Sequence, residues 1–280
     1  MNRRSTLIAI AALCTAALTP SAFAQGFDHT HAAWDALLAR HVKIAADGRS
    51  SRVDYKGFVA DRALLGAYLK SVSAVPASDY ATWSKPQQYA FLANAYNAYT
   101  IEKILTRYPN LKSIRDFGSV FGNPWKDRFF TLLGSPQHLD GIEHETMRVP
   151  GVFDDPRVHV AVNCASIGCP LLGDRALTAD RLDAQLEDLM KRFLSDRSRN
   201  RYEPQTKSLD LSRIFDWYKV DFERGSKSFL GYAGFAGVQD VAARYADQLA
   251  DKETDRAALR AKSVPVKHLD YDWSLNDSGR

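Results

Sequence analysis

The stretch Asp155–Pro170 most constrains how this chain can fold. Its sequence, DPRVHVAVNCASIGCP, is an apolar run followed by residues typical of a tight turn. The pattern predicts a buried central strand over Arg157–Asn163 that leads into a turn. His159, Cys164 and Cys169 all lie in this short stretch, so we expect any chemistry of the protein to involve it.

The N-terminus has the three parts of a signal peptide. Arg3 and Arg4 make it positively charged, Leu7–Leu18 is apolar, and Ala22–Ala24 offers small residues for a cleavage site. The apolar run is shorter than the roughly 20 residues that a membrane span requires. We expect cleavage after Ala24, a periplasmic or secreted mature protein, and no membrane span further along the chain.

Charge and motifs exclude several classes of function. Without the signal peptide the chain keeps 35 of its 37 basic residues against 33 acidic ones, a balance that argues against a nucleic-acid partner. The sequence lacks a glycine-rich loop followed by Lys-Ser or Lys-Thr, and it lacks the Gly-x-Ser-x-Gly pattern of serine hydrolases. We therefore predict no cofactor, and an unidentified small molecule or peptide as the ligand.

The strongest helix pattern begins at Ser84. Ser84–Gln87 offers an N-cap, an early proline and a capping-box glutamine, and aromatic residues then recur at helical spacing as far as Arg107. Asn94 and Asn97 lie among these aromatic residues, and a buried asparagine must be hydrogen-bonded. Either both tie the helix to neighbouring backbone, or one of them orients a catalytic histidine or binds substrate.

A second capping box is indicated at Asp140–Glu143, which predicts a helix that begins at Asp140 and ends before Pro150. This helix would carry Glu143 and His144. Glu143 then has two interpretations, as the structural acid of the capping box or as a residue of the site.

The remaining elements do not alternate regularly. Helices are expected over 27–40, 61–69, 178–195, 213–219, 229–232 and 238–249, and strands over 51–55, 127–133, 208–211 and 264–273. This order argues against a doubly wound parallel sheet. We expect an α+β fold, a single domain over residues 25–280 in which several helices pack on a small, mainly antiparallel sheet.

Several segments of the chain match a known protein family in their residues and in their order along the chain. They are 91–100, 139–144, 155–170, 214–218 and 271–276, within residues 50–276. On these segments the chain resembles the bacterial domain-of-unknown-function 547 family, for which no reaction is settled. The resemblance invites comparison with papain-like and transglutaminase-like thiol enzymes, as an analogy of fold. Leu171 departs from the family, where a second proline commonly follows Pro170, and this puts only the turn geometry in doubt.

Cys164 is the candidate nucleophile of a thiol enzyme. A thiol needs a base that lowers its pKa and donors for a developing oxyanion, and N–H groups of the turn after Cys164 could be those donors. Along an extended strand His159 would lie roughly 16 Å from Cys164, on the opposite face. His144 comes from the preceding helix and is therefore the preferred base.

The other polar residues receive supporting roles. Glu143 adjoins His144 in the helix, where neighbouring side chains point about 100° apart, so we expect it to pair with His159 or Arg157. Asn163 shares a face with His159 on the predicted strand. Glu143, His159 and Asn163 are accordingly candidates for orienting groups or for substrate binding.

Three interpretations of the protein stay open. The first is an exported thiol-dependent hydrolase or acyl transferase acting on amide-like bonds, with Cys164 as nucleophile and His144 as base. The second is a non-enzymatic binding or interaction protein, in which the oxidising compartment joins Cys164 to Cys169 in a disulfide. The third is a zinc protein with both cysteines, His144 and His159 as ligands, although the gap between the cysteines is wide for zinc.

Overall fold

The computed structural model describes residues 26–118 and 123–279. The expected signal peptide, residues 1–24, lies outside the described residues. The helices are α1 (Ala32–His41), α2 (Tyr55–Ala60), α3 (Arg62–Ser73), α4 (Ala77–Thr82), α5 (Lys85–Leu105), α6 (Leu139–Ile142), α7 (Val158–Ala161), α8 (Leu182–Ser195), α9 (Ile214–Trp217), α10 (Lys219–Phe222), α11 (Val238–Arg244), α12 (Ala246–Leu249) and α13 (Glu253–Arg260). The strands are β1 (Val42–Ile44), β2 (Ser51–Val53), β3 (Phe130–Leu132), β4 (Ser135–Gln137), β5 (Arg201–Glu203), β6 (Ser208–Leu211) and β7 (Val266–His268).

The strands of the described residues form three small sheets, where the sequence predicted one. β1 pairs with β2 and β3 with β4 as antiparallel hairpins, and β5, β6 and β7 form a three-stranded sheet in that order. β6 and β7 run parallel, with Leu209 opposite Val266. The mixed α+β class is confirmed, and most pairings are antiparallel as expected.

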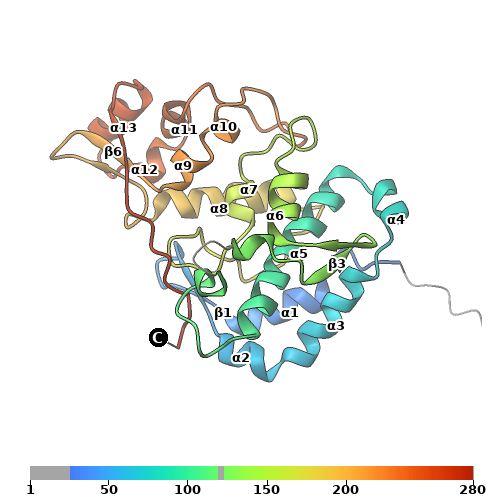
Figure 1. The fold of residues 1–280 in the computed structure, drawn as a ribbon. Coiled ribbons are helices and arrows are strands. Elements are labelled where there is room, and N and C mark those ends of the chain that lie inside the picture. Colours follow the sequence, from blue (N-terminus) through green and yellow to red (C-terminus); the bar gives the residue numbers. More distant parts are fainter. Residues whose placement is uncertain (1–25, 119–122, 280) are drawn as a thin grey trace, which may run out of the picture.

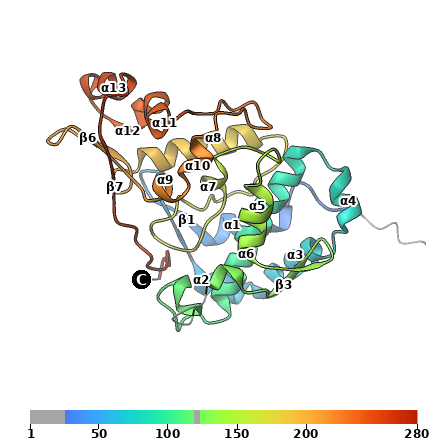
Figure 2. The same ribbon diagram turned by 45° about the horizontal axis from the view of Figure 1, so that its top comes forward.

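Helix α5 forms the centre of the larger hydrophobic cluster, in contact with α2, α3 and α6 (Figures 1 and 2). The predicted capping box is present, since the Ser84 side chain accepts from the Gln87 N–H and the Gln87 side chain accepts from the Ser84 N–H. From Tyr89 to Leu105 every residue except Glu102 is buried. A helix that is enclosed on all sides is typical of the middle of a core.

Helix α8 joins this cluster to a second one. Leu182 and Leu186 pack in the cluster around α5, whereas Met190 and Phe193 pack with β6 and the helices that follow it. α8 begins at Leu182, later than the predicted residue 178. The N–H of Thr178 donates to the Gln185 side chain, and a turn separates Thr178 from the helix. The shared helix therefore holds the two halves of the core together.

The predicted strand over Arg157–Asn163 is wrong, because Val158–Ala161 forms the single helical turn α7. Asp155 starts this turn, since its carboxylate accepts from the backbone N–H two residues later. A short buried apolar run cannot be assigned to strand or helix by periodicity alone. The argument that separated His159 from Cys164 assumed a strand and no longer holds.

The predicted capping box at Asp140 is also wrong. His138 is the N-cap of α6, where its Nδ1 accepts from the Gly141 N–H at 2.8 Å. A π-helical turn over Glu143–Met147 follows α6 directly, and such turns occur frequently at functional sites. Asp140 and Glu143 are thereby free of any capping role and face a cavity. The predicted helix at 229–232 is a turn.

The segment after β7 crosses the loop that holds the two cysteines. β7 ends at His268, short of the predicted 264–273, and the chain continues without regular structure. The N–H groups of Ile167 and Gly168 donate to carbonyls at 274 and 272, and the Asn276 N–H donates to the Ala165 carbonyl. The cysteine loop and this C-terminal segment therefore form one continuous wall.

Candidate functional site

A cavity of about 190 Å³ lies where α5, α6, α7, α9 and the cysteine loop meet. Its polar wall contains Asp140, Glu143, His144, His159 and Cys164. The structure thus brings together four candidates from the sequence, Glu143, His144, His159 and Cys164, from separate segments of the chain.

Glu143 is the most deeply buried acid of this wall, with 6 % of its surface exposed. Burial raises its pKa from 4.5 to about 7, although the nearby Arg148 guanidinium and the Tyr96 hydroxyl act in the opposite direction. A carboxyl with a pKa near neutrality can both donate and accept a proton under physiological conditions. This is the behaviour expected of an acid–base group in an active site.

Both histidines lie close to the Glu143 carboxylate. Its Oε1 is 3.8 Å from Nδ1 of His144 and 3.8 Å from Nδ1 of His159. The pKa of each histidine is lowered to about 4, mainly by burial and in part by the Arg148 guanidinium, which contacts Nδ1 of His144. Near neutral pH both imidazoles are therefore uncharged, and the exchangeable proton of the cluster lies on Glu143.

Asp221 positions His159 and was missed by the sequence analysis. Its Oδ2 is 2.8 Å from Nε2 of His159 and 2.6 Å from Nε of Arg148. Burial acts to raise the pKa of Asp221, but the contacts with His159 and Arg148 outweigh it and lower the pKa. The ring of His159 also stacks on Tyr218 at 4.0 Å, so its orientation is fixed from two directions. Asp221 lies on the short helix α10, and no local motif marks it.

Cys164 and Cys169 are joined by a disulfide, as one interpretation of the sequence predicted. Cys164 is half-buried in the cavity wall, and Cys169 is buried. The Tyr271 hydroxyl lies 3.2 Å from the Cys164 sulfur and 3.1 Å from the Cys169 sulfur. Gly168 permits this arrangement, because a Cβ there would come within 2.9 Å of the Tyr271 ring.

The three candidate asparagines bind backbone. Asn94 donates to the Leu177 carbonyl and accepts from the Leu177 N–H, at 2.8 and 3.1 Å. Asn97 bonds to the Ala161 carbonyl and to the Asn163 N–H, and the Asn163 side chain donates to the carbonyl of residue 170. These contacts match the structural interpretation of Asn94 and Asn97. All three side chains brace the cavity from behind, outside its lining.

Aromatic rings form the rest of the cavity wall. Trp217 is 45 % exposed and stacks on Trp273 at 5.7 Å, and Trp273 meets Trp125 edge to face at 5.8 Å. The sequence analysis did not predict this aromatic group. Large rings exposed beside a polar cavity provide apolar contact area for a ligand.

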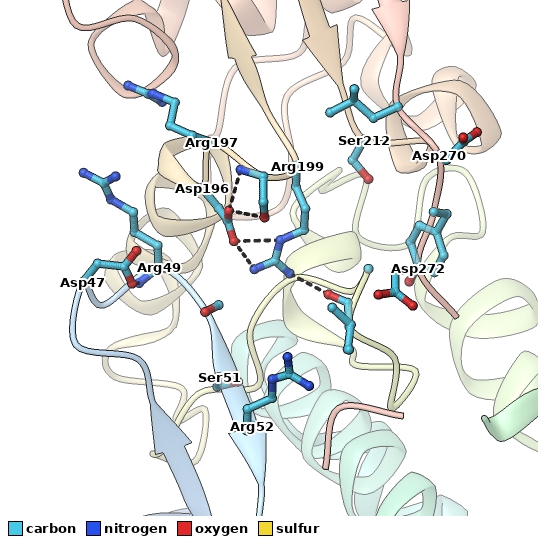
Figure 3. A pocket seen from close by; sticks show the side chains of 16 residues that line it. Asp47, Arg49, Ser51, Arg52, Asp196, Arg197, Arg199, Ser212, Asp270 and Asp272 are labelled. Atoms are coloured by element: carbon cyan, nitrogen blue, oxygen red, sulfur yellow. Dashed lines mark hydrogen bonds and ion pairs between the residues drawn. The ribbon is translucent and has the colours of Figure 1, made fainter. Parts of the chain in front are cut away.

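A second, open cavity of about 570 Å³ also borders the cysteine loop, at Ile167 and Gly168. Figure 3 shows Arg49 and Arg52 on one side of it and Asp270 and Asp272 on the other. Tyr271 lines both cavities. The two cavities therefore share Tyr271 and parts of the cysteine loop as lining.

The proposed zinc ligands do not form a metal set in this structure. Among residues 26–118 and 123–279 no group of three or more His, Cys, Asp or Glu side chains is arranged to hold a metal ion. In the same part of the chain no helix is long and apolar enough to cross a membrane.

Comparison with known proteins gives one match. No curated protein and no solved structure matches the chain, so the analogy with papain-like folds receives no support. Residues 80–194 match the family described as protein of unknown function, DUF547. The matched region contains Glu143, both histidines and both cysteines of the cavity, and over it the chain resembles the DUF547 family.

Proposed function

We propose that the protein is an exported hydrolase or acyl transferase that acts on amide-like bonds in the cavity around Glu143. The observation that carries the proposal is the buried Glu143 carboxyl, with its pKa raised to about 7, between two uncharged histidines. A group that exchanges its proton near neutral pH, in a cavity partly closed to water, is suited to general acid–base catalysis.

Cys164 supplies the nucleophile when the disulfide is open. It lies in the same cavity as His144, the base inferred from the sequence, and Glu143 is 3.8 Å from that base. In the molecules in which Glu143 is ionised, His144 can take the thiol proton and pass it to the carboxylate, because the carboxylate has the higher affinity for a proton. The thiolate then attacks the carbonyl carbon of the substrate, and the C–N bond breaks as protonated Glu143 returns the proton to the leaving amine through His144. Water or an acceptor amine then cleaves the thioester, gives up one proton to His144 and Glu143, and frees Cys164 as a thiolate.

A substrate with an apolar portion fits the aromatic wall. The exposed Trp217 and its neighbour Trp273 offer ring faces at the cavity, and the polar groups lie deeper. This arrangement favours a ligand that places its scissile bond inward and an apolar group against the tryptophans.

The single-cysteine variants test the proposal. Cys169→Ser leaves Cys164 free, and Cys164→Ser leaves only the buried Cys169. With p-nitrophenyl acetate as an acyl donor, we expect mass spectrometry to find an acetyl group on Cys164 in the first variant and none on Cys169 in the second. The acylation rate should depend on pH with an apparent pKa near 7, and Glu143→Gln should abolish that dependence. Acylation no faster than that of free N-acetylcysteine would refute the proposal.

The disulfide itself favours a second candidate function. With Cys164 and Cys169 joined, the described residues contain no free thiol, and the cavity would serve a binding protein. In that case acyl donors and peptide amides should quench tryptophan fluorescence without being turned over, in the wild type and in Cys169→Ser alike.

A further inference from the structure

The two sulfur atoms of the disulfide differ in accessibility. Both cysteines border the cavity, but Cys164 is half-buried whereas Cys169 is only 4 % exposed. A thiolate that enters the cavity therefore meets the Cys164 sulfur first. In thiol–disulfide exchange the attacked sulfur must be reachable, and the other sulfur leaves.

Hydrogen-bond donors surround the sulfur that would leave. The Cys169 sulfur accepts from the Cys164 N–H at 3.1 Å, from the Tyr271 hydroxyl at 3.1 Å and from the Ser166 hydroxyl at 3.4 Å. The two hydroxyls are 2.9 Å apart, and each carries one proton that can turn to whichever sulfur gains charge. Hydrogen bonds to a charged acceptor are stronger than those to a neutral one, so these donors stabilise the Cys169 thiolate.

The loop does not depend on the disulfide for its shape. Asn163 binds the carbonyl of Pro170 at 2.8 Å, and the guanidinium of Arg199 donates to the carbonyls of Ile167 and Cys169. The C-terminal segment adds backbone hydrogen bonds at Ile167 and Gly168. A reduced loop would therefore keep its two sulfurs close together and could close again.

From these three observations we infer that Cys164 and Cys169 form an exchangeable redox pair that reacts with dithiols in the cavity. A thiolate of the dithiol attacks the Cys164 sulfur, the Cys164–Cys169 bond breaks, and Cys169 leaves as a thiolate that then takes a proton. The second thiolate of the dithiol attacks the mixed disulfide, and Cys164 leaves as a thiolate. The dithiol is thereby oxidised by two electrons to its disulfide, and the protein disulfide is reduced to two thiols.

This activity goes beyond the proposed hydrolysis and does not require it. Exchange needs only the disulfide, its donors and an entering thiol. It would also release the Cys164 thiol on which the proposed acyl transfer depends, so the oxidised and reduced forms of one cavity would have different chemistry.

The first test follows reduction of the native wild type by dithiothreitol, with alkylation and mass spectrometry to count thiols. We expect both cysteines to become alkylated while circular dichroism shows the fold unchanged. Tyr271→Phe removes one donor from the leaving sulfur and should slow reduction roughly tenfold. Tyr202→Phe removes the same atom from a residue outside both cavities and should leave the rate unchanged.

The second test separates the roles of the two cysteines. Oxidised glutathione should form a mixed disulfide with Cys164 in Cys169→Ser at least about tenfold faster than with Cys169 in Cys164→Ser. Equal rates would overturn the assignment of the attacked sulfur. A wild-type disulfide that dithiothreitol reduces only at denaturant concentrations that unfold the protein would overturn the inference, whatever the acyl-transfer assays show.

Discussion

Replacing Glu143 by glutamine should change the stability of the protein in a way that depends on pH. The carboxyl has a pKa of about 7 in the folded protein against 4.5 ordinarily. At about 1.4 kcal/mol per pKa unit, the difference corresponds to about 3 kcal/mol. Glutamine has nearly the same shape and cannot ionise.

The sign follows from which state holds the proton. Below pH 4.5 the carboxyl is protonated in both the folded and the unfolded chain, and its ionisation does not affect stability. Between pH 4.5 and about 7 the unfolded chain ionises first, so the free energy of unfolding of the wild type falls as pH rises. Above about pH 7 the carboxyl is ionised in both states, and the free energy of unfolding of the wild type falls no further on its account. Glu143→Gln should therefore gain about 3 kcal/mol relative to the wild type between pH 4.5 and pH 8.

Urea unfolding of both proteins across this range, with the disulfide intact, measures the effect. The relevant quantity is how the difference in free energy of unfolding between the variant and the wild type changes with pH. Any contact that glutamine loses changes this difference by the same amount at pH 4.5 and at pH 8. Glu145→Gln is the matched control, because that side chain is 66 % exposed two residues away. A difference between Glu143→Gln and the wild type that stays constant from pH 4.5 to 8 would refute the buried-acid description of the site.

Three further substitutions test the framework of the cavity. Asn163→Ala leaves the Pro170 carbonyl and the Ala165 N–H without their side-chain partner. In urea titrations it should lower the free energy of unfolding by about 2–5 kcal/mol. The control Asn110→Ala, at an exposed position, should change that free energy by less than about 0.5 kcal/mol. Asp221→Asn breaks a buried network with Arg148, Arg224 and His159 and should lower the free energy of unfolding by about 3–5 kcal/mol. The control Asp216→Asn, in the exposed pair with Arg213, should lower it by only about 0–1 kcal/mol. Gly168→Ala should displace the Tyr271 ring and alter the fluorescence of Trp217 and Trp273, while Gly66→Ala, with open space around its Cβ, should leave that fluorescence unchanged.

Local signals in the sequence predicted some elements well. The helix after Ser84 has its N-cap, its proline and its aromatic residues in one uninterrupted pattern, and the structure has α5 there. The run after Asp155 was assigned to a strand because a single buried helical turn and a short buried strand have the same composition. Most of the errors concern elements of only a few residues, whose form is decided by tertiary packing.

Four of the residues that the sequence singled out lie in one cavity, but the sequence did not predict how they are arranged. Glu143, His144, His159 and Cys164 do meet in one cavity. Asp221 could not be found, because it reaches the site from a distant part of the chain and lies in none of the segments that resemble the family. Tyr271 opens the segment 271–276, but nothing in its spacing showed that it contacts the cysteines. Contacts of this kind depend on how α10 and the C-terminal segment pack, which the local sequence does not determine.

Tyr271 lines both cavities, and this position would allow one to influence the other. One face of its ring lies over Gly168 and its hydroxyl touches both sulfurs, while the same residue borders the open cavity beside Arg199 and Asp272. A molecule that binds in the open cavity and shifts Tyr271 would change the equilibrium between the disulfide and its reduced form. Because such coupling is reciprocal in binding free energy, opening the disulfide would change the affinity of the open cavity by the same factor.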